Sequence, residues 1–338
     1  MKPRKLIGFV LLLALSLIFL HGRGYARPAK QTHLSIDKQT HPVLTKPQSL
    51  QPAEIAVLYP DIGDPFRFMF RQMILGIEAQ LGERVATFKL GQAQNTDELT
   101  KMLQQLRIKA VITLGSMAYK QAQMIDGLPV VAGGILPGVT IDRDDIPIHS
   151  LTPEPRQLFG QLLMLRPESR RIFVVFNPQT SAWLIQLARD AAKQHNLELV
   201  SFEAKDLRTA ARHYRQMLTM ADPDRDAVWL LQDTSVVDDD AVLPLVLEMA
   251  WYKRVLVFSS SLEHVQKGAL FTLYPNYVEL GKTLAISAQN ILTQRNNPGQ
   301  IALRSTFSAI NTKTAANIGL TIPNRQLQGF SKSFPEPQ

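Results

Sequence analysis

Short apolar runs rich in β-branched residues alternate with longer amphipathic runs along most of this 338-residue chain. In the first half, the short runs have the composition of buried strands and the segments between them have the apolar spacing of helices. Strands are expected at 55–59, 85–90, 110–114 and 129–132, and helices at 65–81, 96–106 and 117–125. Strand-helix alternation of this kind predicts a parallel sheet with right-handed crossovers.

The pattern restarts after a proline-dense stretch at 147–155, which is the expected first crossing between two units. A helix is expected at 155–165, then strands at 171–176, 198–202, 227–231, 255–258 and 270–273, with helices at 181–194, 208–220 and 239–251. A chain of this length, 45% hydrophobic, can bury two cores. Two successive α/β units of similar size predict two lobes with a cleft between them.

The first 53 residues differ in character from the rest. Lys2, Arg4 and Lys5 precede an apolar run at 6–20, and small residues surround Tyr25, so 1–26 is predicted to be a cleaved signal peptide. The alternative is an uncleaved anchor, but fifteen residues fall short of the roughly 20 that span a bilayer. Residues 27–53 are rich in Pro, Gln, Thr and Lys and are predicted to be a flexible linker.

The net charge of +8 is concentrated in that leader. Residues 1–53 hold eight basic side chains against one acid, Asp37, which leaves +8 minus +7, or +1, for the remainder. A nearly neutral folded part gives no support for nucleic acid as a partner. Cysteine is absent, which excludes disulfides, thiolate metal sites, cysteine nucleophiles and a lipid-modified cysteine anchor.

Polar and small residues follow most of the expected strands. In open parallel sheets ligands bind beyond the carboxyl ends of the strands, where helix N-termini offer free N–H groups. Ser116 and Ser181, with neighbouring backbone amides, are predicted to bind a carboxylate, Asp233 an ammonium or a hydroxyl, and Phe66 to face the ligand. The predicted ligand-binding residues are Asp61, Phe66, Ser116, Gly134, Asn177, Ser181, Asp233, Thr234 and Ser260. Helix capping is the competing role for most of them.

Catalytic and metal-binding motifs are not found. The chain has no GxSxG, Walker or GxGxxG motif and no HExxH, so neither an enzyme nor a cofactor is expected. The Asp238–Asp240 run lies where a helix is expected to begin, and it lacks the glycine and distal glutamate of a calcium loop. We therefore expect it to cap the helix and predict no metal site.

Several segments resemble one protein family. They are 152–158 (TPEPRQL) opening a helix, 171–178 (RIFVVFNP), 226–234 (DAVWLLQDT), 265–271 (VQKGALF), 277–282 (YVELGK) and 310–323 (INTKTAANIGLTIP). In order and spacing they are similar to the ABC transporter substrate-binding proteins whose better-known members take aromatic amino acids. The resemblance runs from about residue 55 to 323. At 134–138, where relatives usually carry a polar Thr/Ser-Asp-Pro, this chain has GILPG, which places amino-acid binding in question.

The resemblance implies a type I periplasmic-binding fold, with two Rossmann-like lobes joined by a three-strand hinge. Lobe 1 is then expected at 54–150 plus 275–297 and lobe 2 at 151–274 plus 298–330. It also implies a monomer in the periplasm that captures a small polar molecule by hinge closure and delivers it to an ABC permease. The closing segment ending at Pro323 is expected to return to lobe 2.

Two alternatives stay open at this stage. The same fold serves periplasmic sensors or accessory proteins that report a ligand to a membrane receptor or an outer-membrane uptake system. A permease and an ATPase encoded nearby would favour transport, and a lone histidine kinase or cyclase would favour sensing. A two-lobed α/β transferase is disfavoured by the missing phosphate loop.

Overall fold

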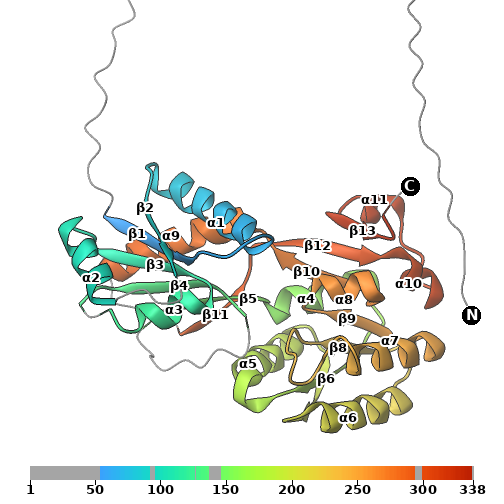
Figure 1. Cartoon of the computed structure of the whole chain (residues 1–338). Helices are drawn as coiled ribbons and strands as arrows, with labels where there is room; N and C mark the ends of the chain where they lie inside the picture. Colours follow the sequence, from blue (N-terminus) through green and yellow to red (C-terminus); the bar gives the residue numbers. More distant parts are fainter. Residues whose placement is uncertain (1–53, 92–95, 126, 137–145, 294–298, 337–338) are drawn as a thin grey trace, which may run out of the picture. The chain divides into compact units, whose positions relative to one another are not determined.

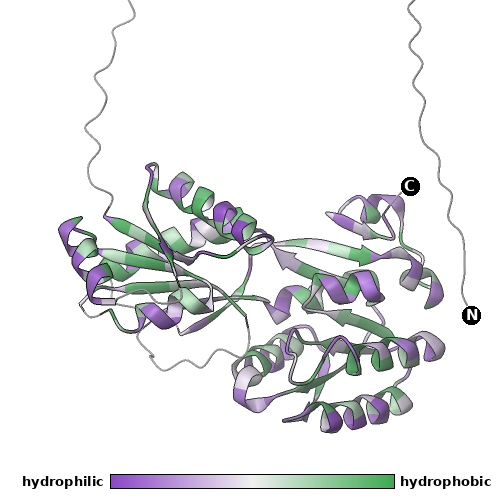
Figure 2. Cartoon of the chain, in the orientation of Figure 1, coloured by the Kyte–Doolittle hydropathy of each residue, from purple (hydrophilic) through white to green (hydrophobic). Residues whose placement is uncertain are grey.

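The computed structural model describes residues 54–91, 96–125, 127–136, 146–293 and 299–336 (Figure 1). The expected signal peptide at 1–26 and linker at 27–53 lie outside the described residues. The strands form two sheets, and Figure 2 shows them largely in the hydrophobic colour, with mixed colours on the helices. No helix among the described residues combines the length and apolar character needed to cross a membrane.

The first sheet has six parallel strands in the order β11-β5-β4-β3-β1-β2. Its strands are β1 (Ile55–Pro60), β2 (Ala86–Leu90), β3 (Ala110–Leu114), β4 (Val130–Ile135), β5 (Ile148–Pro153) and β11 (Gln300–Leu303). Helices α1 (Phe66–Leu81) and α9 (Tyr277–Thr293) pack on one face, and α2 (Thr96–Gln105) and α3 (Ser116–Ala122) on the other. The β3 strand is buried throughout, as its continuous apolar sequence requires.

Helices α1 and α9 pack with their backbones in close approach. A Cβ atom on Gly76 would lie 1.9 Å from the carbonyl oxygen of Val278, and one on Gly281 would lie 2.0 Å from that of Met73. Because the obstructing atoms are backbone, a side-chain rotation cannot relieve either clash. Glycine is therefore required at these two positions. It allows α1, from early in the chain, to pack directly against α9, from late in the chain.

The second sheet has seven strands in the order β13-β12-β10-β9-β8-β6-β7. They are β6 (Arg171–Phe176), β7 (Glu198–Glu203), β8 (Asp226–Leu230), β9 (Leu256–Ser259), β10 (Phe271–Pro275), β12 (Thr306–Asn311) and β13 (Lys332–Phe334). All neighbouring pairs are parallel except β10 with β12. The chain leaves the second sheet after β10, passes through α9 and β11 at the first sheet, and returns as β12. This return makes β12 antiparallel to β10.

Helices cover both faces of the second sheet. On one face lie α4 (Pro155–Leu165), α5 (Pro178–Gln194) and α10 (Thr312–Asn317), and α11 (Asn324–Leu327) adds a partly buried leucine there. On the other face lie α6 (Leu207–Met220), α7 (Val242–Lys253) and α8 (Leu262–Lys267). The first of these two cores centres on stacked rings of Trp229, Phe258 and Phe271, with Phe159 meeting Trp229 edge-on at 5.6 Å between ring centroids.

The chain passes between the two sheets at three points, after β5, after β10 and between β11 and β12. Backbone hydrogen bonds tie these connections together: the N–H of Glu154 donates to the carbonyl of Leu303 at 2.9 Å, and that of Asn276 to Ser305 at 3.0 Å. Arg304, in the third connection, also forms a salt bridge with Glu154. The hinge expected from the resemblance thus corresponds to a hydrogen-bonded cluster of three connections.

The sheets give the course of the chain through these crossings. The first sheet extends through β5 to Pro153 and includes β11. The chain changes sheets at 304–305, between β11 and β12. From β12 onward it stays in the second sheet. The expected strands and helices of the alternating pattern are all present, with ends shifted by up to three residues.

Candidate functional site

The carboxyl ends of β6 and β8 bring five polar residues into one hydrogen-bonded network. These two strands are parallel neighbours, so the loops that follow them lie at the same edge of the sheet. The network consists of Asn177, Thr180 and Ser181 after β6, and of Asp233 and Ser235 after β8. Three of the residues predicted as ligand contacts, Asn177, Ser181 and Asp233, are therefore neighbours.

Asp233 is the centre of this network. Its Oδ2 accepts from the Thr180 hydroxyl at 2.6 Å and from the Ser181 hydroxyl at 3.2 Å. Its Oδ1 accepts from the Ser235 hydroxyl at 2.6 Å and from the Ser235 N–H at 3.0 Å. The carboxylate, which is 7% exposed, thus has four donors for its roughly four lone-pair sites.

This arrangement fixes what the hydroxyls can offer a ligand. A carboxylate accepts, so Thr180 and Ser181 donate to Asp233; the Thr180 hydroxyl also lies 3.3 Å from the Asn177 carbonyl, and Ser181 is only 1% exposed. The half-buried Thr180 therefore keeps lone pairs that can accept from a ligand. Acceptors suit a ligand that donates, such as an ammonium or a hydroxyl group. In this geometry the Ser181 hydroxyl donates to Asp233, and its predicted contact with a ligand carboxylate stays a prediction.

Asn177 has two roles at once. Its side-chain oxygen accepts from the N–H of Gln179 at 3.0 Å, which caps α5, and its Nδ2 donates to the Ser235 hydroxyl at 3.1 Å. The capping role that competed with ligand binding is thus confirmed for this residue. Thr234, between Asp233 and Ser235, is exposed at the same loop.

Ser260 is engaged elsewhere. Its hydroxyl accepts from the indole N–H of Trp229 at 3.0 Å, and it is 4% exposed. The neighbouring Ser259 hydroxyl lies 2.7 Å from Nδ1 of His264, donates to the carbonyl of Leu230 and accepts from the N–H of Ser261. Burial lowers the pKa of His264 to about 4. This serine and histidine are closed inside the fold, where they stabilise the loop after β9.

Residues at the first sheet are placed less compactly. The Gly115 N–H donates to the Gly133 carbonyl at 2.8 Å, so Ser116, which follows β3, and Gly134, near the end of β4, lie at neighbouring strand ends. Gly134 has φ of +70°, and a Cβ there would lie 3.2 Å from the terminal methyl of Met73. Ser116 is exposed at the start of α3, whose N-cap, Gly115, provides no side-chain hydrogen bond.

Asp61 and Phe66 lie apart from that pair. Asp61 is exposed and faces Lys89 at 3.8 Å, which gives it a local partner on β2. Phe66 is the first residue of α1 and is 48% exposed. Phe70, one turn further along α1, is buried and packs against Tyr59 and beside Gly115. Four of the predicted contacts therefore mark the first sheet's carboxyl edge without forming a connected network.

Two features escaped the sequence reasoning. Ser235 completes the Asp233 network, and the Asp-x-Ser pattern directly after an expected strand is a signal that could have identified it. A cavity of about 120 Å³ lies between β5, β11 and α9, beside His149. His149 is 5% exposed, its Nε2 has no hydrogen-bond partner, and burial lowers its pKa to about 4. Nothing in the sequence around His149 signalled a buried histidine in a strand.

The expected capping role of the acidic run is confirmed. The carboxylate of Asp238 accepts from the N–H groups of Ala241 at 3.2 Å and Val242 at 2.8 Å, where α7 begins. Asp239 forms a salt bridge with Lys267. Within the described ranges, no three His, Asp or Glu side chains gather closely enough to hold a metal ion.

Comparison with known families identifies the chain. Residues 157–332 match the family model described as ABC transporter substrate binding protein, which is more than half of the chain. The chain belongs to this family. The matched stretch contains β6, β8 and the whole Asp233 network, so the network lies within the family's own region of this substrate-binding protein. A search of curated proteins found no match.

Solved structures confirm the fold. This substrate-binding protein is 16% identical to an ABC domain from Streptococcus pneumonia in complex with L-Trp, with a TM-score of 0.51, covering 83% of this chain and 100% of the other. It is 14% identical to a ligand-free, open substrate-binding protein with adhesive properties from Clostridium difficile, with a TM-score of 0.58 over 83% and 99% of the two chains. A conserved domain protein from Vibrio cholerae gives 17% identity and a TM-score of 0.51 over 83% and 99%. The fold is the type I periplasmic-binding architecture, and the protein is a solute-binding one.

Proposed function

We propose that the protein is exported to the periplasm, captures a small polar ligand by closure about the three connections, and delivers it to an ABC permease. Membership of the substrate-binding family supports the solute-binding part of this proposal. The basic and apolar segment at 1–20 supports export. Lobes at 54–153 with 276–303, and at 154–275 with 305–336, are part of the proposal.

The observation that carries the ligand chemistry is the Asp233 network. The half-buried Thr180 hydroxyl donates to Asp233 and keeps lone pairs that can accept, so the second lobe binds the donor end of the ligand, an ammonium or a hydroxyl group. The exposed Ser116, at the start of α3 in the first lobe, offers the complementary donor for a carboxylate. A ligand with an ammonium at one end and a carboxylate at the other fits both, which makes an amino acid the first candidate.

Aromatic amino acids come first within that class. One similar solved structure holds L-Trp, and Phe66 offers an exposed ring beside the first lobe's strand ends. The GILPG segment at 134–138 replaces the polar contact usual among relatives, so the ligand is expected to make fewer polar contacts to the first lobe. An uncharged polyol, which donates hydroxyls to the same acceptors, is the ligand class to compare with amino acids.

A thermal-shift screen of residues 27–338 tests the proposal. A ligand that binds only the folded state raises the melting temperature by mass action, by about 2.7 kcal/mol of added stability at a hundredfold excess over Kd. We expect a shift with one or more amino acids and none with Thr180→Val, which removes the hydroxyl but keeps the side-chain shape. The control is Thr219→Val on α6, where the exposed hydroxyl bonds only the backbone carbonyl of Arg215. Absence of any shift across amino acids and polyols would count against solute capture at this site.

A further inference from the structure

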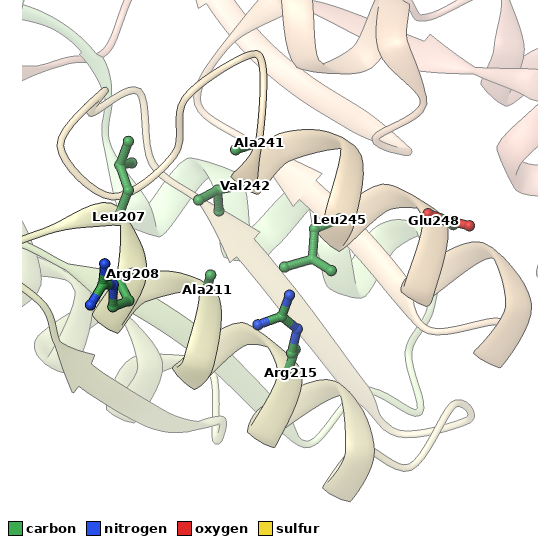
Figure 3. Close-up of a pocket in the computed structure, with 8 residues that line it drawn as sticks. All are labelled: Leu207, Arg208, Ala211, Arg215, Ala241, Val242, Leu245 and Glu248. Carbon is green, nitrogen blue, oxygen red and sulfur yellow. The ribbon is translucent and has the colours of Figure 1, made fainter.

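A groove runs between α6 and α7 on the outer side of the second sheet (Figure 3). Its volume is about 440 Å³, and none of the residues lining it belongs to the Asp233 network or to the predicted ligand contacts. The wall from α6 carries Arg208 and Arg215, and the wall from α7 carries Leu245 and Glu248. The lining residues are Leu207, Arg208, Ala211, Arg215, Ala241, Val242, Leu245 and Glu248.

The α7 helix is unusually apolar for a helix at the surface. Its sequence, VLPLVLEMAWYK, places Leu243 and Val246 in the core but also leaves Pro244, Trp251 and Tyr252 exposed. Trp251 is 39% exposed and Tyr252 is 79% exposed. Glu248 and Lys253 are exposed on the same helix, and Lys313 of α10 lies over the Trp251 ring, so the apolar side chain that α7 gives to the groove is Leu245.

The α6 helix provides a cationic wall opposite Leu245. Arg208, Arg212 and Arg215 are spaced i, i+4 and i+7, which places them on one stripe, and all three are exposed. Among the described residues none of the three forms a salt bridge with an acid. The nearby Asp206 uses its carboxylate to cap α6 by accepting from Thr209.

We infer that this groove docks an acidic amphipathic helix of a partner protein. Charge complementarity selects the occupant: two arginines on one wall require carboxylates, and the apolar floor formed by Ala211 and Leu245 requires an apolar side chain between them. The protein's own leader carries eight basic residues and one acid at 1–53, so it has the wrong charge to fill the groove. Glu248 on the opposite wall would repel an anionic membrane surface. A concave groove also suits a protruding helix better than a flat membrane.

The spacing of the arginines defines the partner helix further. Arg208 and Arg215 are seven residues apart, which is about 10.5 Å along the helix axis. A helix lying along α6 meets both with acidic residues at i and i+7, and a leucine at i+3 or i+4 then faces Ala211 and Leu245. A basic residue on the other flank would pair with Glu248.

The test uses residues 27–338 and a labelled helical peptide of about 15 residues that carries this Glu-Leu-Glu spacing. Two control peptides have Lys in place of both glutamates or Ser in place of the leucine. Fluorescence anisotropy measures binding to the wild type, to the double variant Arg208→Glu/Arg215→Glu, and to Arg189→Glu. Arg189 is an exposed arginine on α5, on the opposite face of the sheet, and is the matched control.

We expect the acidic peptide to bind the wild type and the Arg189→Glu variant equally. The double charge reversal should weaken the affinity for the acidic peptide by about tenfold or more, which is about 1.4 kcal/mol. The double variant should also bind the lysine peptide, which the wild type does not. The inference is overturned by acidic-peptide affinity unchanged by the double reversal, by no acidic-peptide binding up to about 1 mM, or by tighter binding to anionic phosphatidylglycerol vesicles than to the peptide. Self-association of the wild type that the double reversal abolishes also overturns it, in favour of a second copy of the chain.

Discussion

His264 should make the second lobe lose stability as the pH falls from neutral. The side chain is 6% exposed, and burial lowers its pKa from the ordinary value of 6.5 to about 4, against a smaller opposing effect of Asp239. In the unfolded chain the imidazole takes up a proton below pH 6.5, whereas in the folded chain it does so only near pH 4. Stability from the neutral imidazole is therefore complete above pH 6.5 and is lost between pH 6.5 and 4.

The size of this effect follows from the shift. A difference of one pKa unit corresponds to 1.36 kcal/mol, so the loss is about 2 kcal/mol at pH 5 and about 3 kcal/mol at pH 4. Replacing His264 by Gln removes the titration while keeping a polar side chain near the Ser259 hydroxyl. The variant is expected to be less stable than the wild type at pH 7 and to lose less stability on acidification.

Urea titrations followed by tryptophan fluorescence measure this effect in the lobe concerned. All three tryptophans of the chain, at 183, 229 and 251, lie in the second sheet and its helices. The difference in unfolding free energy between wild type and His264→Gln should narrow by about 2 kcal/mol from pH 7 to pH 5. A difference that stays constant over this range would refute the reasoning, because it would show that burial does not hold this imidazole neutral.

Three further predictions concern packing and buried polar groups. Gly76→Ala should cost about 3 kcal/mol of stability, because its Cβ would meet the Val278 carbonyl, whereas the control Gly63→Ala, with open space around it, should be near neutral in thermal unfolding. Ser260→Ala should cost about 2 kcal/mol by leaving the buried Trp229 indole N–H without its acceptor; an unchanged urea midpoint would contradict this. His149→Leu should reduce the loss of unfolding free energy that the first lobe shows on acidification, because burial lowers the pKa of His149 to about 4. Urea unfolding followed by circular dichroism at pH 7 and pH 5 measures this loss.

The alternating part of the fold is readable from the sequence because its strands are buried on both faces. The strand at 110–114, AVITL, and that at 171–176, RIFVVF, are continuous apolar runs bounded by turn residues, and both were predicted at their observed limits. β5 was missed because IHSLTP carries polar residues whose burial depends on its neighbours β4 and β11. Nothing local in the sequence distinguishes such a strand from a loop.

The Asp233 network was predictable from the sequence in part, for a related reason. Strand ends predicted Asn177, Ser181 and Asp233 because parallel strands deliver their loops to one edge. The direction of the hydrogen bonds was not predictable, since it depends on which groups Asp233 gathers in space. In that arrangement Ser181 donates to Asp233 and Ser260 accepts from the Trp229 indole N–H, while their contacts with a ligand stay predictions.

The most direct test of the solute-capture account is a map of the ligand on the protein by amide chemical-shift perturbation. Residues 27–338, labelled with ¹⁵N, would be titrated with the compound that gives the largest thermal shift. The account predicts that the strongest perturbations fall on residues 115–117 and 133–135 of the first lobe and on 177–181 and 233–235 of the second. Perturbations confined to one lobe, or centred on the α6–α7 groove, would contradict it.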